Sequence, residues 1–232
     1  MPERLLELPP ARGIAICAPD HKTYKTPLGR QPPMTTILGA TSAGKERLQQ
    51  WLQRPDAEAI STAAKQRGTW THKAIEGWIN AHSRGEPFSD PQHFAFSGYW
   101  RNIRPWLQNH WDQKVAIERT VYSPLGFAGT FDALGYVNYG KDPEALTLLD
   151  WKTSKRKRDA TLVEDYFCQL AGYALGLKYV YGVVPQRALL VIARPAGPAP
   201  DIWELDATEL AAATTRFKAR LKAYYSMPQE DA

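Results

Sequence analysis

Apolar residues recur at helical spacing in the first half of the chain, and this pattern then changes to the alternation and short apolar runs of strands. The helical pattern predicts helices over residues 45–52, 57–83 and 91–111. Gly68 is a candidate break in the second of these helices, and Pro105 is a candidate kink or boundary in the third. The short β-branched run at residues 34–38 is compatible with a strand or with the start of a helix.

The second half of the chain predicts strands and helices in an alternating order. The run at residues 188–193 is almost wholly apolar, which is typical of a strand covered on both faces. Leu170, Ala174, Leu177 and Tyr181 recur at helical spacing and predict a buried helical stripe. The predicted strands are residues 115–122, 127–139, 146–152, 188–193 and 201–205, and the predicted helices are residues 160–182 and 207–225.

Length and composition indicate one buried core with a helical elaboration, because the chain has 232 residues and 44% apolar content. Residues 1–33 are rich in proline and glycine and predict a flexible or loosely docked arm. We therefore expect a helical region over residues 34–112, within the same domain as an α/β core over residues 113–226.

Several protein classes are disfavoured by the composition. The sequence contains no run of eighteen apolar residues, so no membrane span is expected. The first residues carry glutamates and lack a long apolar centre, so neither a signal peptide nor a transit peptide is expected. Two cysteines are too few for a disulfide framework or a four-cysteine cluster, which favours a cytoplasmic protein. The net charge of +5 adds only a weak indication of polyanion binding.

Charged residues stand at the end of an apolar strand, where they are unusual without a function. Asp150 and Lys152 are two residues apart, so their side chains lie on the same face of the predicted strand. An antiparallel hairpin can bring Asp132 beside them. Two neighbouring carboxylates suit Mg²⁺ or Mn²⁺, and a lysine can orient or deprotonate a water. The alternative is a surface Asp/Lys pair on an amphipathic strand.

Four further residues are candidates for the functional site, and some of them also have a purely structural explanation. His72 is in line with Ile75 and faces inward, and from pattern alone such a histidine is more often a core residue. Gln169 and Tyr173 share one flank of a predicted helix. Glu118 lies on the first strand of the core, where a cross-strand ion pair would equally explain it.

The order Gly129-x-x-Asp132, Asp150-x-Lys152 and Gln169-x-x-x-Tyr173 resembles the PD-(D/E)XK nuclease superfamily. The resemblance is closest to its RecB-type branch, which includes the mitochondrial genome maintenance exonuclease and CRISPR-associated adaptation nucleases. A stretch from Arg67 to Glu76 is similar to the helical region of the mitochondrial type, so the resemblance covers about residues 33–226. It implies an α/β fold, with a restriction-endonuclease-like mixed central sheet flanked by helices and a helical N-terminal elaboration.

The resemblance also implies roles for individual residues. The metal ligands it implies are His72, Asp132, Asp150 and the carbonyl of Trp151. Lys152 becomes the catalytic lysine, with Gln169 and Tyr173 positioning the substrate or the groups that activate water. The residues expected to act on the substrate side are Glu118, Ser154, Lys155, Arg156, Lys157 and Arg158. For residues 155–158 this expectation rests on their position directly after the lysine strand, and a solvated loop is the alternative.

The activity that the resemblance implies is a Mg²⁺- or Mn²⁺-dependent exonuclease on DNA, with a preference for single strands. A histidine ligand would favour Mn²⁺. Some relatives hold an iron–sulfur cluster with four cysteines, which two cysteines cannot supply, so no cluster is expected. The chain shows no helicase motor, so unwinding would need a partner protein. A bacterial or viral protein of DNA repair, recombination or replication is the expected setting.

Two other functions stay open from the sequence. Residues 39–46 nearly match the phosphate-binding loop GxxxxGK[ST], but Glu46 replaces the hydroxyl residue that binds Mg²⁺, which disfavours a nucleotide hydrolase. A non-catalytic nucleic-acid binding module would explain the charge and the aromatic residues. It would not explain the ordered occurrence of Asp132, Asp150 and Lys152.

Overall fold

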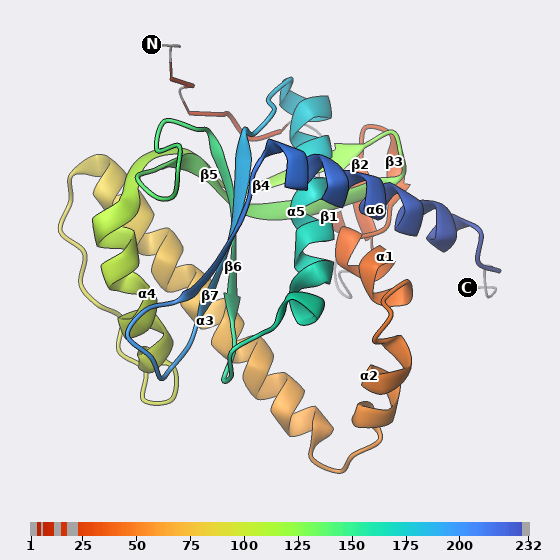
Figure 1. The fold of residues 1–232 in the computed structure, drawn as a ribbon, viewed down its shortest axis with the longest axis horizontal. Coiled ribbons are helices and arrows are strands. Elements are labelled where there is room, and N and C mark those ends of the chain that lie inside the picture. The colour runs from red at the N-terminus through yellow and green to blue at the C-terminus, as the bar shows by residue number, and fades with distance from the viewer. Residues whose placement is uncertain (1–3, 6, 12–14, 18–22, 229–232) are drawn as a thin grey trace.

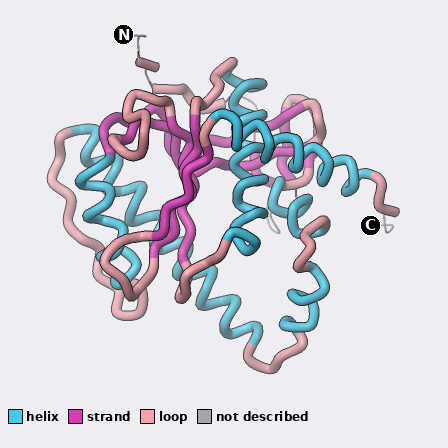
Figure 2. The backbone as a smooth tube through the Cα atoms, viewed as in Figure 1, coloured by secondary structure: helices cyan, strands magenta, loops and turns pink. Residues whose placement is uncertain are grey.

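The computed structural model describes residues 4–5, 7–11, 15–17 and 23–228. Within these residues, six helices and eight strands form one large and one small sheet with helices around them (Figures 1 and 2). No helix of the described part combines the length and apolarity needed to cross a bilayer.

The large sheet has its strands in chain order. It contains β4 (Trp111–Ser123), β5 (Phe127–Val137), β6 (Thr147–Thr153), β7 (Arg187–Ala193) and β8 (Asp201–Leu205). The pair β6–β7 is parallel and the other pairs are antiparallel. A parallel pair needs a crossover connection, and helix α5 (Ala160–Tyr181) supplies it. The sheet is therefore mixed, as the sequence predicts.

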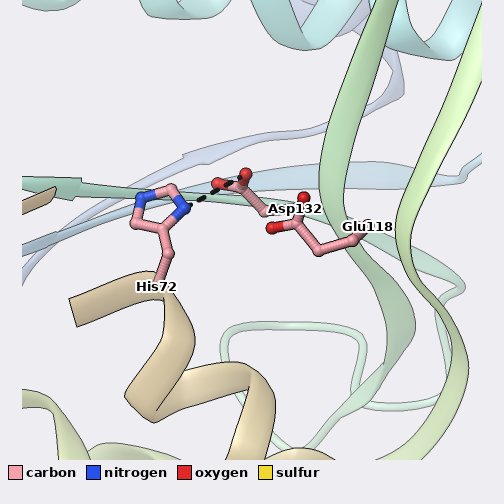
Figure 3. Close-up of side chains that lie close together, drawn as sticks. All are labelled: His72, Glu118 and Asp132. Carbon is pink, nitrogen blue, oxygen red and sulfur yellow. Dashed lines mark ion pairs between the residues drawn. The ribbon is translucent and has the colours of Figure 1, made fainter. Parts of the chain in front are cut away.

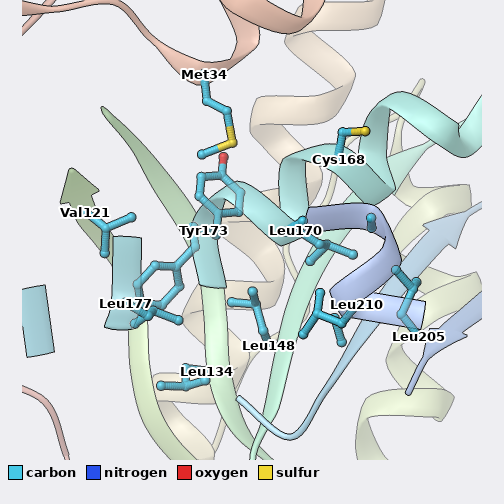
Figure 4. Packing of buried hydrophobic residues seen from close by; sticks show 14 of the residues in the cluster. Met34, Val121, Leu134, Leu148, Cys168, Leu170, Tyr173, Leu177, Leu205 and Leu210 are labelled. Carbon is cyan, nitrogen blue, oxygen red and sulfur yellow. The ribbon is translucent and has the colours of Figure 1, made fainter. Parts of the chain in front are cut away.

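Helices cover both faces of this sheet (Figure 1). One apolar cluster joins the sheet to α5, α1 (Met34–Ala40) and α6 (Ala207–Tyr225), and Figure 4 shows its packing around Leu148 and Leu170. A second cluster joins the opposite face to α3 (Ala57–Arg84) and α4 (Ser97–His110). This three-layer arrangement is consistent with the restriction-endonuclease-like fold predicted from the sequence.

The ambiguous segments of the first half are helical. Residues 34–38 lie in α1, and residues 45–52 form α2 (Lys45–Leu52). Helix α3 passes through Gly68 without a break and ends at Gly85, whose φ of 66° suits a left-handed helix end. Pro105 lies inside α4, where burial of Ile103 and Trp106 offsets the lost backbone donor.

The predicted N-terminal arm contains strands that the sequence pattern did not indicate. β1 (Ala15–Cys17), β2 (Thr23–Thr26) and β3 (Gly29–Gln31) form a small antiparallel sheet. Gln31 docks this sheet on the core, because its Nε2 donates to the Ser123 carbonyl over 2.9 Å. Other residues of the predicted arm, namely 1–3, 6, 12–14 and 18–22, lie outside the described residues.

Gly135 is expected to be intolerant of a side chain. A Cβ at this position would lie 2.4 Å from the Gln113 carbonyl oxygen, beside the irregular pairing of β4 and β5. Gly135→Ala should therefore destabilise the protein by about 1–3 kcal/mol in urea unfolding. Gly68→Ala is the matched control, because nothing lies within 4 Å of its added Cβ. It should stabilise α3 by about 1 kcal/mol, and equal effects of the two changes would contradict this packing.

Candidate metal centre

Three acidic residues lie at one level of the sheet, where its strand pairing is interrupted. The pairs Ile117↔Ala133 and Arg119↔Phe131 flank Glu118 and Asp132 on β4 and β5. The β5–β6 pairing ends at Ala133↔Leu149, one residue before Asp132 and Asp150 would meet. The strands therefore separate where the carboxylates of β4, β5 and β6 come together.

The Asp132 carboxylate takes the place of a strand partner at this separation. Its Oδ2 accepts a hydrogen bond of 2.7 Å from the backbone N–H of Trp151. A buried N–H without a partner would be costly, so this contact fixes the carboxylate at the end of the ladder. Burial raises the pKa of Asp132, but the charge and hydrogen bond of His72, the charge of Lys152 and the Trp151 N–H outweigh it and hold this pKa below its usual value.

His72 reaches the same point from α3. Its Nδ1 lies 3.4 Å from Asp132 Oδ1 (Figure 3). Its Nε2 lies 2.8 Å from the carbonyl oxygen of Trp151. Burial lowers the pKa of His72, but the charge and hydrogen bond of Asp132 more than offset it and raise this pKa to about 9. In the metal-free protein, an imidazolium therefore donates to both oxygens. These contacts place His72 against the carboxylate of Asp132, and a metal ligand and a hydrogen-bonded core histidine would both make them.

Glu118 completes a group with His72 and Asp132. Ligand atoms of the three residues lie within 4.8 Å of one another, although Glu118 as a whole residue is exposed. Its φ of 47° is the one positive value among the described residues other than glycine. Such a conformation is costly in a strand and is concentrated at functional sites. Burial of the carboxylate and the charge of Asp132 raise the pKa of Glu118 to about 7.

Asp150 and Lys152 form an ion pair beside this group. Asp150 is 0% exposed, and its Oδ1 has no hydrogen-bond partner among the described residues. Burial raises the pKa of Asp150 to about 6, with Asp132 adding to the effect and Lys152 opposing it. Burial lowers the pKa of Lys152, but Asp150 and Asp132 raise it above its ordinary value, so the ammonium stays charged.

Gln169 and Tyr173 approach the carboxylates from α5. Gln169 Nε2 donates to the Tyr173 hydroxyl over 2.7 Å. Burial and the charges of Asp150 and Asp132 raise the pKa of Tyr173 well above its usual value, so its phenol keeps its proton. Gly129 makes room for this ring, since a Cβ there would lie 2.9 Å from Tyr173 Cε1.

The donor atoms fit a hard divalent cation. His72, Glu118 and Asp132 form the one group of three or more candidate ligands found among the described residues, and Asp150 lies outside it. The unpartnered Oδ1 of Asp150 is a further oxygen beside the group. Carboxylate oxygens suit Mg²⁺ and Mn²⁺, and an imidazole nitrogen suits Mn²⁺ better. Glu118, predicted on the substrate side, lies with the candidate ligands.

The predicted basic loop follows β6 directly. Ser154 is buried. Its Oγ donates to the Arg156 carbonyl over 2.6 Å and accepts from Arg158 Nε over 3.1 Å. Ser154 therefore shapes the loop. Lys155 and Lys157 line a cavity of about 790 Å³ together with the two arginines of the loop. Arg67 also lines it, although the sequence assigned no role to this residue.

The segment that nearly matches a phosphate-binding loop has another local structure. The apolar run before it is helix α1, whereas that motif follows a strand. Gly44 precedes the first residue of α2, and its backbone N–H donates to Ser42 Oγ over 3.3 Å. The structure therefore disfavours the nucleotide-hydrolase alternative.

Comparisons with known proteins do not place the chain in a family. No family model matches it, and no curated protein matches its sequence. A solved structure of a protein from Eubacterium rectale, described as a candidate exonuclease, is similar at 11% identity and a TM-score of 0.45, over 68% of this chain and 66% of that one. The solved structure of SSO0001 is similar at 11% identity and a TM-score of 0.39, over 82% and 74%. At these scores the likenesses assign neither family nor function.

Proposed function

We propose that this protein is a metal-dependent nuclease that hydrolyses phosphodiester bonds of DNA. The observation that carries the proposal is the group of His72, Glu118 and Asp132 beside the buried pair of Asp150 and Lys152, at a break in the sheet. Buried charges of this kind are costly for folding, which favours a catalytic role over a structural one.

One set of residues in the site would bind a cation, and another set would donate hydrogen bonds or protons. His72, Asp132 and Glu118 would hold the cation, with Asp150 and the Trp151 carbonyl beside them. When bound, a divalent cation supplies Lewis acidity that stabilises charge on a phosphate and lowers the pKa of water.

Lys152 and Tyr173 are the groups that would act on the reacting atoms. The Lys152 ammonium is oriented by Asp150 and can donate to a phosphate oxygen or hold a water in place. The Tyr173 hydroxyl accepts from Gln169, so its own proton is available to a third group.

The finer proposal is an exonuclease that prefers single-stranded DNA. The support is the resemblance of the motifs, the net charge of +5 and the basic loop that follows the strand of Asp150 and Lys152. We place the enzyme in DNA repair, recombination or replication in a bacterial or viral setting, with a helicase or replication protein as a partner.

The proposed activity is tested with a panel of labelled DNA substrates. Purified protein is incubated with linear single strands, circular single strands and duplex, each with Mn²⁺, Mg²⁺ or EDTA. The expected result is shortening of linear single strands in Mn²⁺, with circles left intact and no reaction in EDTA. Cleavage of circles would show an endonuclease. Intact substrates under every condition, with DNA still bound, would favour the non-catalytic binding module instead.

Metal binding is expected to release protons at neutral pH. The pKa of His72 is about 9, so a metal-free protein at pH 7 holds a proton there that a metal ligand must lose. Mn²⁺ should therefore release close to one proton from His72, and its affinity should rise with pH until His72 is deprotonated. Titration calorimetry in buffers of different ionisation enthalpy measures the release. His72→Gln should release fewer protons, and an unchanged release would exclude His72 as a ligand.

A further inference from the structure

A groove lies between the α2–α3 hairpin and the loop that follows β6. Its cavity of about 790 Å³ has two chemically different walls. One wall comes from α2 and the first half of α3, which project below the sheet in Figure 1. The other wall is formed by residues 154–158.

The helical wall is largely apolar and partly open to solvent. Trp51, Ile60, Ala63 and Ala64 line the cavity. Helix α2 has no buried residue, and Ile60 is 42% exposed. An exposed apolar face that lines a cavity marks a site of contact with another molecule.

The opposite wall is cationic, which indicates that the molecule bound in the groove carries negative charge. Lys155, Arg156, Lys157 and Arg158 line the cavity, and Arg67 of α3 adds a fifth cation to its lining. Arg67 is held there because its Nε donates to Thr153 Oγ1 over 3.1 Å and its guanidinium lies 5.2 Å from the Tyr99 ring centroid. Cations facing an aromatic and aliphatic wall match a chain that has phosphates on one side and bases on the other.

The groove and the candidate metal centre share two elements, α3 and the end of β6. Arg67 lines the groove and donates to Thr153, the residue after Lys152, and His72 lies five residues further along α3. The distance along α3 from Ile60 to His72 is about 18 Å at the helical rise. A second hollow, lined by His72, Lys73 and Glu76 of α3 and by Glu118 of β4, lies further along the same helix.

We infer that this groove binds a single strand of nucleic acid, with bases against Trp51 and Ile60 and phosphates against Arg67 and the loop of residues 155–158. The inference rests on the proposed function, because it assigns the path by which that substrate reaches the metal centre. A duplex keeps its bases stacked inside and cannot present them to Trp51. The groove therefore selects an unpaired strand.

Binding without cleavage tests this inference. Fluorescence anisotropy in EDTA compares a labelled oligothymidylate with a duplex, for the wild type, Trp51→Ala and the double variant Arg156→Ala/Lys157→Ala. Trp51→Ala should weaken single-strand binding about tenfold and leave duplex binding nearly unchanged. The double variant should lower the slope of log affinity against log salt by about 1.4, which is about 0.7 for each lost phosphate contact.

Two control variants show whether loss of any exposed aromatic side chain or surface charge weakens DNA binding. Phe94→Ala removes an aromatic side chain that is fully exposed elsewhere, and Lys218→Ala removes an exposed charge on α6. Both should bind like the wild type. Trp51 is only partly buried, so Trp51→Ala should remain folded at the assay temperature, which its melting curve checks.

The possible outcomes distinguish the proposed single-strand groove from the proposed nuclease activity. Wild-type affinity in both groove variants would overturn the inference, even if the wild type cuts DNA in Mn²⁺. Equal weakening of single-strand and duplex binding by Trp51→Ala would also overturn it. Selective loss of single-strand binding, with a wild type that never cuts, would support the groove and contradict the nuclease.

Discussion

Lys152→Ala should reduce metal-dependent DNA cleavage by about 10³-fold, within the range found for positioned proton-transfer and electrostatic groups. The Lys152 ammonium pairs with the buried Asp150, and the pKa of Lys152 is raised, so it is charged at neutral pH. The measurement is the single-turnover rate with saturating enzyme and Mn²⁺. Under these conditions a weaker affinity for DNA does not affect the rate.

Two comparisons make the Lys152 result specific. Lys218→Ala removes the same charge from an exposed position of α6 and should cut at the wild-type rate. Removal of Lys152 leaves the buried Asp150 without its ion-pair partner, so the folded fraction must be measured by circular dichroism. A folded Lys152→Ala protein that cuts within about tenfold of the wild type would contradict the assigned role.

Asp132→Asn should abolish metal binding and cleavage together. The amide oxygen can still accept from the Trp151 N–H, so the end of the β5–β6 ladder is kept while the charge is lost. Loss of several kcal/mol of charge stabilisation corresponds to about 10³-fold or more in rate. Mn²⁺ affinity by calorimetry and the cleavage rate should fall in the same variant.

The Asp132 substitution has a second readout that needs neither metal nor DNA. The pKa of His72 is about 9 because Asp132, with a smaller effect of Asp150, outweighs burial, so this pKa should fall in Asp132→Asn. A histidine titration by NMR measures the change. Asp142→Asn, in an exposed turn, is the control and should leave it unaltered. An unchanged His72 titration in Asp132→Asn would contradict the geometry of the centre.

The larger elements could be predicted from the sequence because their patterns are strong. The change from helical spacing to short apolar runs located β4 to β8, and residues 207–225 form α6 with the predicted bounds. The break considered at Gly68 is absent because glycine only weakens a helix, and α3 is held by its buried side from Thr71 onwards. The strands β1 to β3 are too short to give a periodic signal.

The site could be predicted in part, for reasons of geometry. The spacing of Asp150 and Lys152 fixes their common face, and the β5–β6 hairpin explains the approach of Asp132. The left-handed conformation of Glu118 has no sequence signal in a non-glycine residue, so its position beside His72 and Asp132 came only from the structure. Arg67 and Trp51 meet the basic loop through tertiary packing, which local patterns do not report.

The most direct test of the central claim is a time course on 5′-labelled single-stranded DNA, comparing the wild type with Lys152→Ala in Mn²⁺ and in EDTA. We expect progressive shortening by the wild type in Mn²⁺ alone, and almost none by the variant. Equal cleavage by both proteins, or intact DNA in both while it is still bound, would contradict a nuclease centred on His72, Glu118, Asp132, Asp150 and Lys152.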